Sequence, residues 1–495
     1  DHDVYVLPGP MGQLFGGERS VATLLTRSRK PISSAAETAL LADKGSFGYS
    51  NVRGRYSRRF ADAREIDLSI GYRKGDGPAI YRRDDAYHYS GDIYFPVDGA
   101  YGVRTAGNLY DREGDYVVRP DFGGSQVRRE RFDRSASISV DCHNSERSAR
   151  GEFGYHHLRQ GSYLSGVQKS RLNLTGHGLF ALREWVRGNT AVKVDLSSDY
   201  LEYDDGFRNV SRTNVDLSLG VARWLTGLRW ALTADAEYVE SVGLLPSAAA
   251  LLFRETDRFF AMLSAGYCER EASLLELHLP LRQSAIYGSA AASYTESGNS
   301  DLERERQLVA NLTVEVGSIR TALALSLTGG KIFDGIDWQQ STIRDTLRVY
   351  AMFRPENGDV SFLDVAVQPR ITIKDFARLN AGAAYHWLDY GTDSARPYTP
   401  TFQAFAGLEL HVYWPQRLLH LYAYGEILYS DSYNGYAETA LGEDPIANGK
   451  LSFAIKDFRM NFVFQNVFNR AYRSREHITF PGRYFYYGLT WSFLN

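Results

Sequence analysis

Two acidic clusters are the groups in this sequence best suited to bind a cation. Asp204 and Asp205 precede a glycine within residues 203–209, and Asp334 and Asp337 flank a glycine within residues 333–337. Carboxylates beside a glycine turn suit Ca²⁺, which takes about six to eight oxygen ligands. Neither cluster supplies enough ligands for a full calcium loop, so solvated loop carboxylates are the favoured interpretation.

The other candidate metal ligands are also poorly placed. His156 and His157 are adjacent, and adjacent residues of a strand point to opposite faces, so they cannot share one metal ion without a bulge. Cys142 and Cys268 are the only cysteines, and they form neither a zinc motif nor a disulfide framework. We therefore predict two incidental thiols and no bound metal or cofactor.

No arrangement of side chains points to catalysis. A surface hydrolase needs Ser, His and an orienting Asp or Asn on neighbouring strands, and none of the 11 histidines marks such a triad. The sequence contains no phosphate loop and no dinucleotide fingerprint. The net charge of −3 gives no electrostatic reason for nucleic-acid binding. We predict that the protein is not an enzyme, and a surface-exposed enzyme is the weakest of three alternatives.

The elements that must position these residues are strands of alternating polarity. The last of them places a continuous row of large apolar side chains on one face and small or polar groups on the other. The apolar row consists of Phe485, Tyr487, Leu489, Trp491 and Phe493. The same alternation recurs in residues 192–200, 215–222, 308–316, 319–328 and 458–465. Charged residues on the polar face indicate a water-filled lumen, and the apolar face indicates contact with lipid.

Composition and connection lengths support a transmembrane barrel. The mean hydropathy is −0.34, and no stretch reaches the roughly 18–20 apolar residues of a membrane-spanning helix. Aromatic residues are frequent, with 33 Tyr and 26 Phe against 4 Met. Tight connections are expected at 317–318, 374–376, 414–417 and 456–457. Longer ones are expected at 111–126, 203–210, 296–304, 335–345, 390–400, 431–446 and 469–482.

These patterns define the predicted organisation. Residues 36–495 form an all-β, antiparallel transmembrane barrel of about 22 strands, within a range of 20–24, with short periplasmic turns and longer extracellular loops. Residues 1–35 form a short periplasmic or luminal arm, in which residues 18–27 have helical periodicity. The sequence begins at Asp1, so a processed form that has lost an export signal is expected.

Arginine-rich runs lie in this framework at residues 127–134 and 303–306. Salt-bridged wall or loop is their favoured interpretation. The alternative is a docking surface for a partner or for lipopolysaccharide phosphates, which arginine binds well.

Three stretches resemble the barrel of TonB-dependent receptors. In residues 297–307, Asn299, Leu302 and Glu305 are similar to the family's Asn-x-x-Leu-x-x-Glu loop. Near the C-terminus, two segments are similar to the family's Asn-Leu-Phe-Asp-x-x-Tyr and Pro-Gly-Arg patterns. Their matching residues are Asn466, Phe468 and Tyr472, then Pro481, Gly482 and Arg483. Residues 45–49 are more weakly similar to the family's first hairpin.

The resemblance implies an outer-membrane barrel with both termini in the periplasm. The family also carries an N-terminal plug and a TonB-contacting box, and residues 1–35 match neither. We therefore expect a transport conduit or membrane anchor whose lumen is sealed by a partner subunit. The alternative is a TonB-dependent uptake receptor for a metal chelate or sugar with a separate or lost plug. Expected partners are outer-membrane lipid, lipopolysaccharide, the barrel assembly machinery and a lumen-filling or periplasmic protein.

Overall fold

The computed structural model describes residues 2–8, 22–28 and 35–494, apart from short gaps. The gaps are residues 77–80, 98–100, 118–127, 145–148, 166–169, 207, 226, 280–281, 284–293, 319, 345–348, 391–398, 435–439, 443–444, 471, 476–477 and 481.

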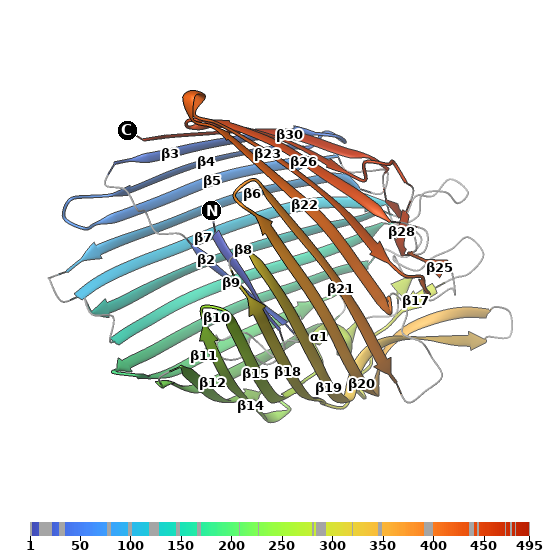
Figure 1. Ribbon diagram of the computed structural model, residues 1–495. Coiled ribbons are helices and arrows are strands. Elements are labelled where there is room, and N and C mark those ends of the chain that lie inside the picture. The colour runs from blue at the N-terminus through green and yellow to red at the C-terminus, as the bar shows by residue number, and fades with distance from the viewer. Residues whose placement is uncertain are drawn as a thin grey trace.

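One antiparallel sheet of 22 long strands closes on itself (Figure 1). The first half of the wall consists of β3 (Glu37–Gly45), β4 (Ser50–Arg59), β5 (Glu65–Gly75), β6 (Tyr81–Pro96), β7 (Tyr101–Val117), β8 (Arg128–Asn144), β9 (Ala149–Ser165), β10 (Ser170–Arg187), β11 (Thr190–Asp204), β12 (Asn209–Leu225) and β13 (Leu228–Val239). The second half consists of β14 (Gly243–Thr256), β15 (Phe259–Arg270), β18 (Glu305–Gly317), β19 (Thr321–Arg344), β20 (Val349–Ile373), β21 (Ala377–Asp389), β22 (Phe402–Trp414), β23 (Leu419–Ser430), β26 (Ile446–Ile455), β27 (Phe458–Gln465) and β30 (Tyr484–Leu494).

The wall forms because each strand alternates apolar and polar residues with period two. On β11, Val192, Leu196 and Tyr200 are exposed on the outside, while Lys193 and Asp195 form an ion pair on the other face. Residues that pair across a ladder point to the same face. Leu40 of β3 pairs with Trp491 of β30, and both are exposed on the outside, at 47% and 51%. The predicted fold of about 22 antiparallel strands is confirmed.

Connection lengths differ between the two rims. At one rim, the connections are tight, and Lys374, Leu418 and Lys456 adopt left-handed backbone conformations there. The four tight connections predicted from the sequence all lie at this rim, which we call the short-turn rim. The opposite, long-loop rim carries the small strands labelled β17, β25 and β28 in Figure 1.

Wall strands extend far into two of the predicted long loops, which are wrong there. Residues 111–117 belong to β7, and residues 335–344 belong to β19. In both cases, the ladder continues to the neighbouring strand, as with Ile336 opposite Asn357. The Asp334-Gly335 pair, taken as a loop signal, instead forms a register shift within the ladder, with Asp334 in a left-handed conformation.

Smaller elements accompany the barrel. β16 (Arg282–Gln283) pairs with β17 (Tyr294–Glu296), which runs parallel to β20. The remaining elements are α1 (Leu274–His278), the 3₁₀ turn η2 (Pro415–Arg417), and the pairs β24 (Tyr433–Asn434) with β25 (Ala440–Leu441) and β28 (Tyr472–Arg475) with β29 (Ile478–Phe480). In the described part of the chain, no helix is long and apolar enough to cross a membrane.

The N-terminal segment forms its own two-stranded sheet. β1 (His2–Pro8) pairs in antiparallel fashion with β2 (Ala22–Ser28). The helix expected over residues 18–27 is therefore wrong where the structure describes them. Two helical turns have little stability of their own, and a strand partner in the same chain supplies backbone hydrogen bonds instead.

Candidate functional site: the charged wall and the luminal strap

The inner face of the first half of the barrel is a wall of ion pairs. Arg104 donates to Asp92 at 2.8 Å and to Glu65 at 2.7 Å. Asp92 lies on the face opposite that of Phe95, which is exposed on the outside, so the cluster points into the lumen. Further pairs on the inner face are Arg55–Asp67, Arg73–Asp84, Arg112–Asp84, Arg150–Asp141, Arg150–Glu152 and His156–Asp199.

Sequence and strand geometry explain these pairs. Adjacent strands lie about 4.8 Å apart, and the planar guanidinium fork spans that distance to reach two carboxylates at once. Most pairs are half-exposed to the lumen, so each contributes little to stability. They place positive and negative groups in close alternation along the inner wall.

A second luminal feature is the segment between β15 and β18, residues 271–304, which we call the strap. Its described parts are residues 271–279, 282–283 and 294–304. The strap begins with α1, whose capping box is complete. The Glu276 amide donates to Ser273 Oγ at 3.2 Å, and the Ser273 amide donates to Glu276 Oε2 at 2.7 Å.

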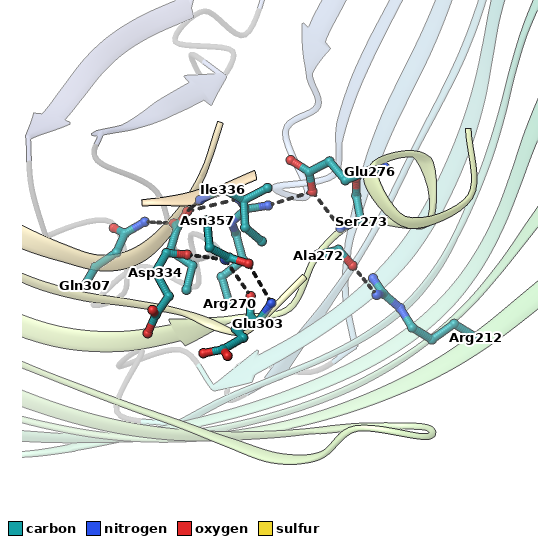
Figure 2. A network of polar contacts seen from close by, with 11 residues as sticks. Arg212, Arg270, Ala272, Ser273, Glu276, Glu303, Gln307, Asp334, Ile336 and Asn357 are labelled. Carbon is teal, nitrogen blue, oxygen red and sulfur yellow. Dashed lines mark hydrogen bonds and ion pairs between the residues drawn. The ribbon is translucent and has the colours of Figure 1, made fainter. Parts of the chain in front are cut away.

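The strap lies on the luminal side of the wall. Arg212 Nη1 donates to the Ala272 carbonyl at 2.8 Å, and the Tyr203 hydroxyl donates to the His278 carbonyl at 3.4 Å. Both wall residues fall on the inner face, because Tyr200 and Val215 of the same strands are exposed on the outside. Ala272 and Tyr203 have 0% and 1% exposure. Figure 2 shows α1 inside the curve of the wall.

A network centred on Arg270 fixes the start of the strap to its end. Arg270 donates to Glu276 at 3.1 Å and to Glu305 at 3.1 Å. Glu305 has 5% exposure and also accepts from the Ile336 amide at 2.8 Å and from Gln307. Every oxygen of this buried carboxylate is therefore engaged, which is the condition for keeping a charge in the interior.

The far part of the strap is tied to the β19–β20 hairpin. Asn299 Nδ2 donates to the Pro355 carbonyl at 2.9 Å, and the Asn299 amide donates to the Glu276 carbonyl at 2.7 Å. Asn357 accepts from the Glu303 amide at 2.7 Å and donates to the Glu303 carbonyl at 3.0 Å. Asn299 and Glu305, singled out by the receptor-like loop pattern, are thus both among the residues that hold the strap.

Burial changes the titration of two strap residues. Burial raises the pKa of the Glu271 carboxyl above its ordinary value, against the opposing effect of Arg212 and Arg304. Burial lowers the pKa of His278, and the positive charges of Arg208 and Arg212 lower it further.

The predicted apolar row of the last strand faces outward. Tyr487, Leu489 and Trp491 are exposed on the outer face of β30, and Phe485 and Phe493 of the same row are half-buried. A role in assembly stays a prediction for these residues.

The C-terminal receptor-like residues form hydrogen bonds within the connection between β27 and β30. Asn466 is buried; its side chain accepts from the Arg470 amide at 3.0 Å, and Arg483 donates to the Val467 carbonyl at 2.7 Å. Gly482 packs against Asn469, whose Oδ1 accepts from the Arg483 amide at 2.8 Å. Phe468 is exposed, and Tyr472 begins β28. Pro481 lies outside the described residues.

The acidic clusters act as turn caps and ion-pair partners. Asp205 is buried and accepts from the Arg208 amide at 2.7 Å, so it is not the solvated loop carboxylate expected. Asp204 accepts from the Gly206 amide at 2.7 Å, and Asp334 pairs with Arg306. Among the described residues, no group of three His, Cys, Asp or Glu side chains could hold a metal ion.

The remaining candidates lie apart from one another. His156 Nε2 lies 3.0 Å from Asp199 Oδ1 on the inner face. His157 Nδ1 lies 3.3 Å from His177 Nδ1 on the outer face. Neither cysteine forms a disulfide; Cys142 is exposed, and Cys268 is buried. In the arginine-rich run of β8, Arg131 pairs with Asp133, and Arg134 pairs with Asp111.

Several residues of the strap network were missed in the sequence. Arg212, Arg270, Ile336 and Asn357 lie on four different strands, so no local pattern marks them. Ser273 and Glu276 did carry a signal, because Ser-x-x-Glu is the capping-box pattern.

No family model and no curated protein matches the sequence. Solved structures do match the fold. The siderophore receptor PirA from Pseudomonas aeruginosa superposes with a TM-score of 0.74 and 12% identity, over 99% of this chain and 86% of that chain. The copper transporter OprC superposes with a TM-score of 0.78 and 12% identity, over 99% of this chain and 85% of that chain. The FrpB iron transporter from Neisseria meningitidis superposes with a TM-score of 0.70 and 11% identity, over 96% of this chain and 85% of that chain. The chain shares the barrel fold of these receptors and transporters.

Proposed function

We propose that this chain is an outer-membrane transport conduit of the TonB-dependent receptor type, whose lumen is sealed by a partner subunit. The observation that carries the proposal is the closed barrel of 22 strands with an apolar outside and a charged inside. Such a wall is stable only with lipid outside and water or polar protein inside. The proposal assigns no catalytic reaction to the chain.

The need for a seal follows from the size of the barrel. Barrels of 22 strands enclose a lumen wide enough for solutes, and outer-membrane transporters of this size are plugged. The strap occupies part of the lumen. The ion-pair wall around Arg104 offers a partner alternating charges at close spacing, which favours a polar surface on that partner. The orientation proposed here places the short-turn rim and both ends of the wall in the periplasm.

The remaining partners belong to the same proposal. Outer-membrane lipid contacts the outer face, with lipopolysaccharide near the long-loop rim. The barrel assembly machinery recognises β30.

The second candidate is a TonB-dependent uptake receptor for a metal chelate or a sugar, with a separate or lost plug. The solved structures favour it, because two of them are a siderophore receptor and a copper transporter. Uptake of the solute that stops when cellular energy is removed would support this candidate over a partner-sealed conduit or an anchor.

The test is purification of the tagged barrel from native outer membranes in mild detergent. We expect a second polypeptide in near-equal amount by mass spectrometry. In planar bilayers, the complex should pass little current, and the barrel stripped of that polypeptide should pass a large, stable current. A barrel that purifies alone and conducts in that state would contradict the sealed-conduit proposal.

A further inference from the structure

A cavity of about 590 Å³ lies in the wall formed by β20 to β23, near the long-loop rim. Its lining includes one residue from each of these four strands: Ala366, Ala384, Gln403 and Ser430. Each of the four pairs with the next across the sheet, so they form one row. Val367, on the alternate face, is exposed on the outside. The row through Ala384 therefore faces the lumen, and we call this cavity the mouth pocket.

Small residues hollow out the mouth pocket. Gly382 lies beneath Phe405, and a Cβ at position 382 would lie 2.4 Å from the Phe405 ring. At the upper edge, Gly442 has a φ of 85°, and a Cβ there would lie 2.5 Å from the Asp431 carbonyl. That turn brings Tyr433 to the edge of the cavity. The floor is thus small, and the walls are aromatic and aliphatic.

The chemistry of the mouth pocket differs from that of the ion-pair wall. Among the residues that the structure describes, none of those lining the pocket is Lys, Arg, His, Asp or Glu. Its polar side chains include two exposed amides, Gln368 and Gln403, and neither has a hydrogen-bond partner among the described residues. Ser430 is already engaged with the Asp431 carbonyl at 3.2 Å. An ionised ligand group would gain no opposite charge from these lining side chains.

We propose that the mouth pocket binds the uncharged, flat and apolar part of the solute that the barrel transports, with the amides of Gln368 and Gln403 bonding its carbonyl or hydroxyl groups. This inference rests on the proposed transport function. A volume of about 300–1,000 Å³ with apolar walls and a few placed polar groups is typical of small-molecule sites.

The test uses acetanilide, a neutral aromatic amide, and 4-acetamidobenzoate, the same molecule with a carboxylate. Saturation-transfer NMR on the purified barrel in deuterated detergent compares the two probes. We expect transfer to acetanilide and an affinity at least about tenfold weaker for the carboxylate. Ala384→Phe, which fills the pocket, should abolish the transfer. Ala106→Phe, on the inner face of β7, should leave it unchanged.

Further variants make the result decisive. Gln403→Leu keeps the cavity and removes one amide, so acetanilide should bind about fivefold more weakly. Heat-modifiable migration on gels confirms that each variant is folded. The proposal is overturned by absent transfer in the wild type, by equal binding of both probes, or by transfer that survives Ala384→Phe.

This experiment does not require conduction or a sealing partner. Probe binding to a barrel that purifies alone and conducts would support the pocket and overturn the sealed conduit. Absence of probe binding to a barrel with a sealing partner would overturn the pocket and leave the conduit standing.

Discussion

Ser46 and Phe485, 439 positions apart, are joined by three hydrogen bonds at the seam where the barrel closes. The Ser46 amide and hydroxyl both donate to the Phe485 carbonyl, at 2.8 and 3.1 Å. The Phe485 amide in turn donates to Ser46 Oγ at 3.1 Å. The first hairpin turn thus extends the ladder between β3 and β30 by one further step.

Replacement of this hydroxyl should weaken the seam. Ser46→Ala leaves the part-buried Phe485 amide without its partner, which costs about 1–3 kcal/mol. We expect a lower midpoint of thermal unfolding. The midpoint is measured by heat-modifiable migration on gels. Ser211→Ala, an exposed serine on β12, is the control. An unchanged midpoint for Ser46→Ala would show that the backbone bonds alone hold the seam.

Loss of the charge on Glu305 should release the strap while the barrel stays closed. Glu305→Gln weakens the bonds from Arg270 and leaves part of a buried network unsatisfied. We expect trypsin to cleave after Arg304 about tenfold faster, with little change in thermal unfolding. Glu303→Gln is the matched control, because that side chain is exposed and only its backbone bonds to Asn357. Equal cleavage of the two variants would refute the role given to Glu305.

Gly482 and Asn469 should behave as a coupled pair. A Cβ at position 482 would lie 2.0 Å from Asn469 Oδ1, so Gly482→Ala must displace the side chain that accepts from the Arg483 amide. We expect a loss of about 1–3 kcal/mol in unfolding free energy for Gly482→Ala. Asn469→Ala removes the clash, so the double variant should lose less than the sum of the two single variants. Additive losses would contradict this coupling.

Acid should loosen the strap through His278. The pKa of His278 is lowered in the folded protein by burial and by nearby arginines, so the attached strap keeps the ring neutral. A detached strap binds a proton near the ordinary value of 6.5, so attachment weakens as the pH falls below that value. Hydrogen exchange of residues 271–279, corrected for the intrinsic rate, should show less protection at pH 5.5 than at pH 7.

Two variants separate the groups that titrate in the strap. His278→Gln should remove the loss of protection in acid. The pKa of Glu271 is raised by burial, so proton uptake by its carboxyl favours attachment as the pH falls, and Glu271→Gln should steepen the loss. Acid-insensitive exchange in the wild type would reject the role of His278.

The sequence was sufficient for the wall because a period of two is a local property. The row from Phe485 to Phe493 lies on one outward face, and the tight turns at Lys374 and Lys456 lie at one rim. The ends of the strands were harder to predict, since Asp334 and Gly335 carry a turn signal that the ladder with β20 overrides. A local signal cannot report a competing partner that lies more than twenty residues away.

The luminal site could be predicted only in outline. Asn299 and Glu305 were found through a resemblance, yet their partners Arg270, Pro355 and Ile336 come from three different strands. The mouth pocket depends on Gly382 beneath Phe405, a cross-strand relationship that needs the register of β21 against β22. Neither feature has a periodicity that a single strand displays.

A closed barrel has no free strand edges. The β19–β20 hairpin, however, extends past its neighbours at one rim and has strand edges there. β19 and β20 contain 24 and 25 residues, whereas β18 and β21 contain 13 each, so the hairpin extends roughly 35 Å beyond its neighbours. β17 covers one edge where Tyr294, Thr295 and Glu296 run beside residues 351–353. An uncovered edge invites strand addition by another chain. At residues 351–353 the strap therefore already occupies the position that an added strand would take.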